Sequence, residues 1–110
     1  ITVRQLMNHS SGLVRYEFNP KFIKDLNAAP DKVWKPEELI AYLFDTKANF
    51  AAGKDWEYSD TNYIVLGMII EKVSGKRYYD LAVNRILKPH DLKRTFPQDG
   101  RVLKGLIQGY

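Results

Sequence analysis

The 110-residue sequence contains no cysteine and only two histidines, His9 and His90. The lack of cysteine excludes disulfides, thiol nucleophiles and cysteine-based zinc sites. Because the histidines are far apart and no carboxylate stands at ligand spacing from them, we expect no metal and no other cofactor. No stretch approaches the roughly 20 apolar residues that span a bilayer. The longest apolar run, Tyr63 to Ile70, is instead expected to form a fully buried helix.

Charge of one sign is not concentrated anywhere in the sequence. The net charge is +4, and the densest basic group, Lys88 with Lys93 and Arg94, is interrupted by Asp91. Proteins that bind nucleic acid usually gather their basic side chains in one stripe. We therefore predict a solvated, mildly basic surface and no nucleic-acid partner. Hydrophobic residues make up 45% of the chain and charged residues 27%, which is typical of a folded globular domain.

Helical periodicity covers most of the chain. Apolar residues recur at helical spacing in five segments, several of which start at a capping residue or a proline. These segments are 2–9, 20–26, 36–45, 61–74 and 77–87. The sequence therefore predicts an all-α unit of four to five helices. A short turn is expected at 91–95 and a tight turn at 98–100, and the last ten residues are expected to be loop or one strand.

The strongest of these predictions is the helix over 61–74. Ser59 or Asp60 can cap its start, and Gly75 is well placed to end it. Its first half is apolar on all sides, so we expect it to lie at the centre of the core. Gly67 costs about 1 kcal/mol inside a helix, which suggests close packing by a neighbour at that point. The long loop before this helix, residues 46–57, is expected to bring Trp56 and Tyr58 back against another part of the chain.

Three segments of the sequence, taken in order, resemble the β-lactamase-like serine hydrolases. That group includes class C β-lactamases, D-alanyl-D-alanine carboxypeptidases and related esterases. The segments are ITVRQLMNHSSGL at 1–13, GKDWEYSDTNY at 53–63, and the stretch 66–75 followed by Ile86-Leu87-Lys88-Pro89. Ala52 before Gly53, and His90-Asp91 after Pro89, depart from the usual pattern.

The resemblance implies a fold with an α/β part and a helical part, with the active site between them. The reactive serine of such enzymes lies in a Ser-x-x-Lys motif, and a Lys-Thr-Gly element lies on a later strand. Neither motif occurs in this chain. Since the chain also starts at Ile1, we expect residues 1–110 to be one helical subdomain excised from a larger protein and inactive alone. Its implied partners are the remainder of its α/β domain and a small-molecule or peptide substrate, and the implied location is the periplasm, the cell envelope or outside the cell.

Tyr58-Ser59-Asp60 matches the Tyr-x-Asn element of that family, so Tyr58 and Asp60 are the candidate catalytic and substrate-binding residues. A serine hydroxyl needs a base, and a tyrosine can act as one only if cations lower its pKa from about 10. By resemblance, Tyr58 would carry the proton. Aspartate in place of asparagine only accepts hydrogen bonds, and its charge should raise the pKa of Tyr58. We expect this to weaken β-lactam turnover and to suit peptidase, esterase or lapsed activity.

Plainer interpretations exist for the same residues. Tyr58 could pack on the first helical turn, and Asp60 could be an ordinary N-cap. His9, next to Ser10 and Ser11, is expected to be structural. The whole chain could also be a non-catalytic binding module derived from the family. A bare domain interface would in addition expose apolar surface, so self-association is expected.

Overall fold

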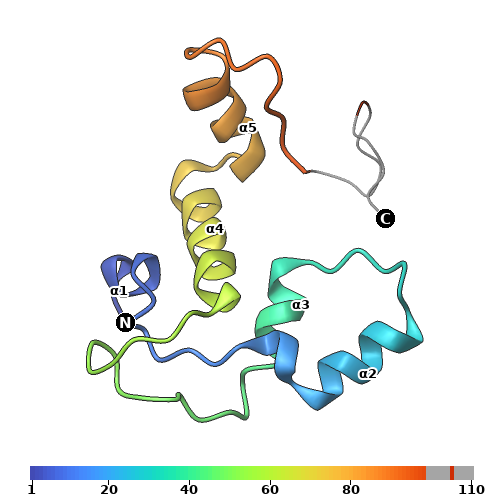
Figure 1. Cartoon of the computed structure of the whole chain (residues 1–110), viewed down its shortest axis with the longest axis vertical. Coiled ribbons are helices and arrows are strands. Elements are labelled where there is room, and N and C mark those ends of the chain that lie inside the picture. Colours follow the sequence, from blue (N-terminus) through green and yellow to red (C-terminus); the bar gives the residue numbers. More distant parts are fainter. Residues whose placement is uncertain (99–104, 106–110) are drawn as a thin grey trace. The chain divides into compact units, whose positions relative to one another are not determined.

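The computed structural model describes residues 1–98 and Gly105. Figure 1 shows the elements in chain order. They are α1 (Val3–Met7), the 3-10 turn η1 (Tyr16–Phe18), α2 (Pro20–Ala28), α3 (Pro36–Ala41), α4 (Asp60–Ser74), α5 (Tyr78–Ala82) and the π-helical turn η2 (Val83–Leu87). No strand occurs among the described residues. The prediction of an all-α unit with four to five helices is confirmed.

The chain forms two compact units, and their boundary falls inside α4. The first unit comprises Ile1–Ile70 and the second begins at Glu71. The expectation that residues 1–110 behave as one subdomain of a larger protein stays a prediction.

Local capping chemistry explains where the first helices begin. The Thr2 hydroxyl oxygen accepts from the Gln5 backbone N–H at 3.3 Å, and the Gln5 side chain accepts from the Thr2 N–H at 2.9 Å. This reciprocal pair is a capping box, which satisfies two N–H groups that the first turn leaves free. At α2, the Asn19 side chain accepts from the Lys21 N–H at 2.9 Å, and Pro20 occupies the first helical position.

The core of the first unit is small and partly aromatic. Its buried apolar side chains are Leu6, Phe22 and Leu66. The Phe22 ring of α2 has its centroid 5.0 Å from that of Tyr16 in η1. Its centroid is also 5.4 Å from those of Trp34 and Tyr42, which lie just before and just after α3, and all three contacts are edge-on. Such aromatic pairs contribute about 0.5–1.5 kcal/mol beyond the area they bury.

Three predicted helix ends are wrong by a few residues. Helix α1 ends at Met7 instead of His9. Helix α2 continues to Ala28, and α3 ends at Ala41 instead of near Asp45. After α3 the chain continues in tighter turns, with N–H groups bonded three residues back, as from Leu43 to Ile40. The segment predicted as one helix over 77–87 is helical, but its second half, η2, is wound as a π-turn.

The prediction that α4 is fully buried is wrong for the described chain. Leu66 is 9% exposed, but Tyr63 is 57% exposed and Ile70 37%. The expected close neighbour of Gly67 is also absent, since no described atom outside its own helix would lie within 4 Å of an added Cβ. The helix is apolar on more sides than the described residues cover.

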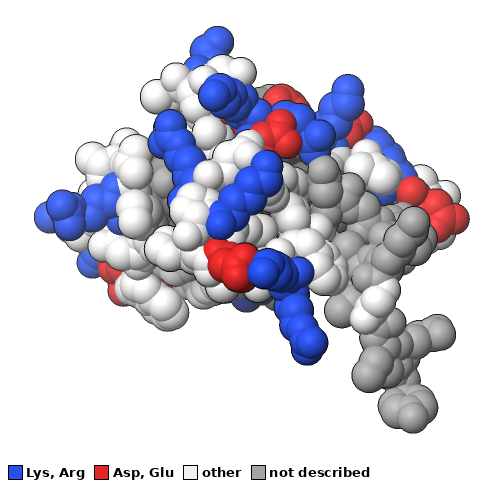
Figure 2. Space-filling model, turned by 90° about the horizontal axis from the view of Figure 1, so that it is seen from above, with Lys and Arg blue, Asp and Glu red and all other residues white. Residues whose placement is uncertain are grey.

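Several further expectations concern surface and termini. No helix among the described residues is long and apolar enough to cross a membrane, and no cluster there could hold a metal ion. Figure 2 shows lysine and arginine side chains as separate groups on the visible face, with acidic side chains among them. The short turn at 91–95 is present, with the Thr95 N–H bonded to the Leu92 carbonyl. The turn predicted at 98–100 and the loop or strand of the last ten residues lie outside the described part, Gln98 and Gly105 apart.

Candidate functional site

The segment after α1 turns back on itself through two left-handed residues. His9 has φ of 59° and Gly12 has φ of 79°. His9 is tolerated there because histidine, with asparagine and aspartate, adopts this region more readily than other side chains. At Gly12 the requirement is also steric, because an added Cβ would overlap the carbonyl oxygen of Phe50.

The long loop between α3 and α4 binds this turned segment through its backbone. The Asn49 N–H donates to the Gly12 carbonyl at 2.9 Å, and the Gly53 N–H donates to the Ser10 carbonyl at 2.7 Å. The Glu57 N–H donates to the His9 carbonyl at 3.0 Å. The loop therefore returns the chain to the segment after α1 and places Trp56 and Tyr58 next to His9, which confirms the prediction that these two rings come back against another part of the chain.

A buried polar network joins the turned segment to the start of α4. The Ser11 hydroxyl donates to the Asn62 side-chain oxygen at 2.5 Å, and the Asn62 amide nitrogen lies 3.1 Å from His9 Nδ1. The Ser59 backbone N–H also donates to His9 Nδ1, at 3.3 Å. Ser11 is 2% exposed, and Ser59 and Asn62 are 0% exposed. Buried polar groups are stable only when bonded, so these contacts hold the two motifs together.

Three further hydrogen bonds extend this buried network to Val14, Tyr16 and Thr61. The Val14 carbonyl accepts from the Thr61 hydroxyl at 2.8 Å and from the Ser59 hydroxyl at 3.3 Å. The Thr61 oxygen in turn accepts from the Tyr16 N–H at 3.4 Å. Thr61 is fully buried. The buried Ser59 and Thr61 side chains therefore fix the first turn of α4 to the half-buried Val14 and Tyr16.

The buried network around Ser59, Thr61 and Asn62 is called the frame below, and Tyr58 lies on its solvent-exposed side. Its side chain is 47% exposed, and its hydroxyl donates to Asp60 Oδ1 at 2.5 Å. The hydrogen bond to Asp60, the charge of that carboxylate and partial desolvation raise the pKa of Tyr58, while the nearby Arg15 guanidinium opposes the shift. The direction agrees with the effect expected of aspartate in place of asparagine. Whether Tyr58 and Asp60 act in catalysis stays a prediction.

An arginine and a glutamate lie beside Tyr58. The Arg15 guanidinium stands 5.7 Å from the centroid of the Tyr58 ring and 4.2 Å from that of Phe18, and its Nε donates to Glu17 Oε1 at 2.7 Å. The other carboxylate oxygen of Glu17 is buried with no hydrogen-bond partner. Glu17 and Asp60 both raise the pKa of the neighbouring Tyr16, after the larger effect of burial. Asp60, Arg15 and Glu17 thus all act on the pKa of Tyr58, Arg15 to lower it and the two carboxylates to raise it.

The histidine and the two serines of the first motif form hydrogen bonds within the chain, and the expectation that they are structural stays a prediction. Ser10 donates to the Asn8 side chain at 2.7 Å, whereas Ser11 bonds to Asn62. Ser11 Oγ also accepts from the Leu13 backbone N–H at 3.1 Å, and His9 Nδ1 accepts from the Ser59 backbone N–H at 3.3 Å. The contact of His9 with Asn62 and with the Tyr58 ring could not be read from periodicity. The only signal for it was that both motifs match the same family in order.

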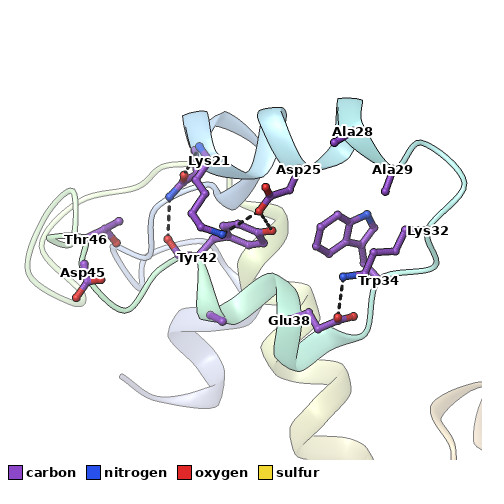
Figure 3. A pocket seen from close by; sticks show the side chains of 12 residues that line it. Lys21, Asp25, Ala28, Ala29, Lys32, Trp34, Glu38, Tyr42, Asp45 and Thr46 are labelled. Carbon is purple, nitrogen blue, oxygen red and sulfur yellow. Dashed lines mark hydrogen bonds and ion pairs between the residues drawn. The ribbon is translucent and has the colours of Figure 1, made fainter.

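A separate hollow of about 890 Å³ lies between α2 and α3, within the first unit. Figure 3 shows the rings of Trp34 and Tyr42 side by side in it, with ion pairs on either side. The Tyr42 hydroxyl donates to Asp25 at 2.7 Å, and Lys21 donates to the same carboxylate oxygen at 2.9 Å. Lys32 lies 3.9 Å from the Trp34 centroid and pairs with a carboxylate of α3. The charges of this hollow largely neutralise one another.

Comparison with known proteins places these features in a family. The family model described as Beta-lactamase matches residues 1–99. Penicillin-binding protein 4* of Bacillus subtilis (strain 168) is 30% identical over 114 residues, which is 100% of this chain and 24% of the relative. This chain therefore spans about a quarter of the length of that relative.

Two solved structures share the fold of the described helices. The D-stereospecific amidohydrolase from Streptomyces sp. superposes with a TM-score of 0.78 at 39% identity, over 84% of this chain and 29% of that one. The D-amino acid amidase from Ochrobactrum anthropi SV3 gives 0.65 at 34% identity, over 81% of this chain and 25% of that one. With a family match over nearly its whole length and these relatives at 30% identity or more, the chain belongs to the Beta-lactamase family, the group of β-lactamase-like and penicillin-binding-protein-like hydrolases.

Proposed function

We propose that this chain is the helical part of an acyl-transfer serine hydrolase and that Tyr58 is its proton-transfer residue. The observation that supports this is the contrast at the start of α4. Ser59, Thr61 and Asn62 are fully buried and bonded, whereas the Tyr58 phenol is half exposed on the opposite side. Such a rigid buried frame beneath one accessible titratable group is suited to holding a reactive side chain in a fixed place.

The nucleophile and its lysine are supplied, in this proposal, by segments outside residues 1–110. A serine hydroxyl attacks a carbonyl carbon once a base removes its proton, and the same group later donates that proton to the leaving atom. Tyr58 can serve both steps only if a cation offsets the effect of Asp60, because Asp60 raises the pKa of the phenol. Arg15 opposes this effect only in part, and alone this chain lacks the nucleophile and its lysine, so it is inactive.

We infer that the substrate bond is an amide outside a β-lactam ring. Two structural relatives are named as a D-stereospecific amidohydrolase and a D-amino acid amidase. Asp60 supports the same choice, since its carboxylate accepts a hydrogen bond from Tyr58 and has no N–H to donate to a lactam carbonyl. An amide N–H or ammonium of a substrate could donate to it.

The partner of this chain is, in the same proposal, the remainder of its own α/β domain. Exposed apolar side chains occur on both α1 and α4, where Val3 is 50%, Met7 60% and Tyr63 57% exposed. The Tyr63 hydroxyl donates to the Met7 carbonyl at 3.3 Å, so these two lie together. Left bare, such a surface should drive self-association. Sedimentation velocity over a hundredfold concentration range should show dimers that dissociate on dilution, and a monomer throughout would contradict this.

The test of the proposed function is intact-protein mass spectrometry. The complete gene product that contains this chain, and this chain alone, are each exposed to a penicillin and to a fluorophosphonate. A stable adduct on the complete protein alone supports a serine acyl-enzyme whose helical part is described here. The Tyr58→Phe variant of the complete protein should form the adduct at least about 100-fold more slowly, in keeping with the loss of a general base.

A non-catalytic module is the second candidate, and one observation favours it. The hydrogen bond from Tyr58 to Asp60 keeps the phenol protonated, which is the state of a packing residue and not of a base. Absence of any adduct on the complete protein would select this candidate. Tyr58 and Asp60 would then be capping and packing residues of a domain that recognises a peptide or protein.

A further inference from the structure

We infer that His9 is a positioning residue for Tyr58, an assignment that rests on the proposed function. His9 binds backbone N–H groups of the two residues that flank Tyr58 in the sequence. Its carbonyl accepts from the Glu57 N–H at 3.0 Å, and its Nδ1 accepts from the Ser59 N–H at 3.3 Å. One residue of the first motif therefore fixes the backbone immediately before and immediately after the candidate proton carrier.

The ring of His9 restrains the Tyr58 side chain as well. The centroids of the two rings lie 4.6 Å apart, with 42° between their planes. The same imidazole contacts Tyr63 at 5.3 Å and the edge of Trp56 at 6.3 Å. Because three aromatic rings surround it, the imidazole has little room to rotate. The imidazole is thus a fixed surface on one side of the Tyr58 ring and restrains the phenol there.

The hydrogen-bond network also defines the chemical form of His9 that can do this. A backbone N–H only donates, so Nδ1 must accept from Ser59 and carries no proton. Asn62 donates to the same nitrogen through Nδ2 at 3.1 Å, because the Ser11 hydroxyl occupies its side-chain oxygen. Leu13 donates its N–H to the Ser11 oxygen at 3.1 Å, which leaves the hydroxyl proton for Asn62. Each hydrogen bond of the network then has a donor on one side and an acceptor on the other. The neutral ring of His9 with its proton on Nε2 is the form that fits this arrangement.

A positioning role predicts a particular kinetic signature. Misplacing a reactive group by about 1 Å can lower a rate about 100-fold without any contact to the substrate being lost. The loss then appears in kcat and leaves KM nearly unchanged. A residue that served only stability would change the fraction of folded enzyme and leave the kcat per folded molecule unaltered.

The experiment distinguishes the role of His9 Nδ1 as a hydrogen-bond acceptor from the role of the imidazole ring as a packing surface. The complete gene product is assayed on the p-nitroanilide of D-alanine, as wild type, His9→Ala, His9→Asn and the control His90→Ala. His90 is an exposed histidine outside the first unit. Asparagine places its Oδ1 as many bonds from Cα as Nδ1 of histidine, and it also tolerates positive φ. All rates are taken per folded molecule, well below the melting temperature of each variant.

We expect His9→Ala to lower kcat about 10- to 100-fold with KM changed less than about threefold, and His9→Asn to recover kcat to within about fivefold of wild type. His90→Ala should match wild type. The inference is overturned if folded His9→Ala keeps kcat within twofold, if the loss lies in KM, or if His9→Asn is no better than His9→Ala. If His9→Ala does not fold, a kcat of His9→Asn within about fivefold of wild type supports the inference, and a larger loss overturns it. Lack of turnover and of adduct in the wild type would overturn the proposed function, and this inference with it.

Discussion

Replacing Asn62 by alanine tests the buried network directly. The Asn62 side chain is 0% exposed and makes two hydrogen bonds, one from the Ser11 hydroxyl and one to His9 Nδ1. A hydrogen bond contributes about 1 kcal/mol net, and a buried group that loses its only acceptor costs about 1–3 kcal/mol. The Ser11 hydroxyl would be such a buried group without an acceptor, since Ser11 is 2% exposed. His9 Nδ1 would keep its hydrogen bond from the Ser59 N–H. The free energy of unfolding should therefore fall by about 2–4 kcal/mol.

The assay is urea unfolding followed by far-ultraviolet circular dichroism, together with the melting temperature. For a domain of this size, each kcal/mol lowers the melting temperature by about 4 °C or more, so a decrease of about 10 °C is expected. The matched control is Asn27→Ala, an exposed asparagine of α2, which should change stability by less than about 0.5 kcal/mol. A double-mutant cycle with Ser11→Ala should give a coupling energy of at least about 0.5 kcal/mol. If Asn62→Ala matched the control, the network would not hold the two motifs together.

Three other perturbations have defined outcomes. At Gly12, φ is 79° and an added Cβ would overlap a loop carbonyl, whereas at Gly75 φ is 65° and the space is open. Gly75→Ala should lower the free energy of unfolding by about 1–2 kcal/mol, and Gly12→Ala should lower it by several times as much. Equal melting temperatures for the two variants would contradict this. Desolvation and a carboxylate partner raise the pKa of Tyr42 to about 12, so the folded state keeps a proton that the unfolded chain loses near pH 10. Stability should fall as pH rises from 10 to 12, and it should fall less steeply in Tyr42→Phe when both are unfolded in urea across that range. Asp60→Asn removes the main cause of the raised pKa of Tyr58, so the ring-carbon NMR titration of Tyr58 should move to lower pH; an unchanged titration would show that Asp60 does not control the phenol.

The helix starts could be predicted because their causes are local. Thr2 and Asn19 each bond to an N–H within three residues, and such pairs are visible in the sequence. The end of α3 could not be predicted in this way. Leu43 and Phe44 continue the apolar stripe, but the Tyr42 carbonyl accepts from the Asn19 side chain at 2.9 Å, a contact across 23 residues. A distant side chain thus takes part in ending the helix.

The burial of α4 was overpredicted for a related reason. Its all-round apolar pattern indicates a helix covered on every side, yet only Thr61, Asn62 and Leu66 are buried. The periodicity of a sequence shows which faces of a helix are apolar and need to be covered. It does not show whether the described chain contains the residues that cover them. At the candidate site, Tyr58 and Asp60 lie close because they are two residues apart, whereas the Ser11, His9 and Asn62 contacts cross about 50 residues and became visible only in three dimensions.

The chain leaves the turned segment after Gly12 and comes back to it at Asn49, where the two backbones are joined by a hydrogen bond of 2.9 Å. Residues 13–48 therefore form an excursion whose two ends are already held together, and at its start Val14 and Tyr16 also bond to Ser59 and Thr61. The entropy of closing such a loop depends weakly on its length, at about 0.6 kcal/mol for each doubling. Relatives are thus free to lengthen, shorten or exchange this excursion while the frame under Tyr58 stays the same. Sequence drift in the family should gather between residues 17 and 48, and it should be scarce at 8–14 and 57–62.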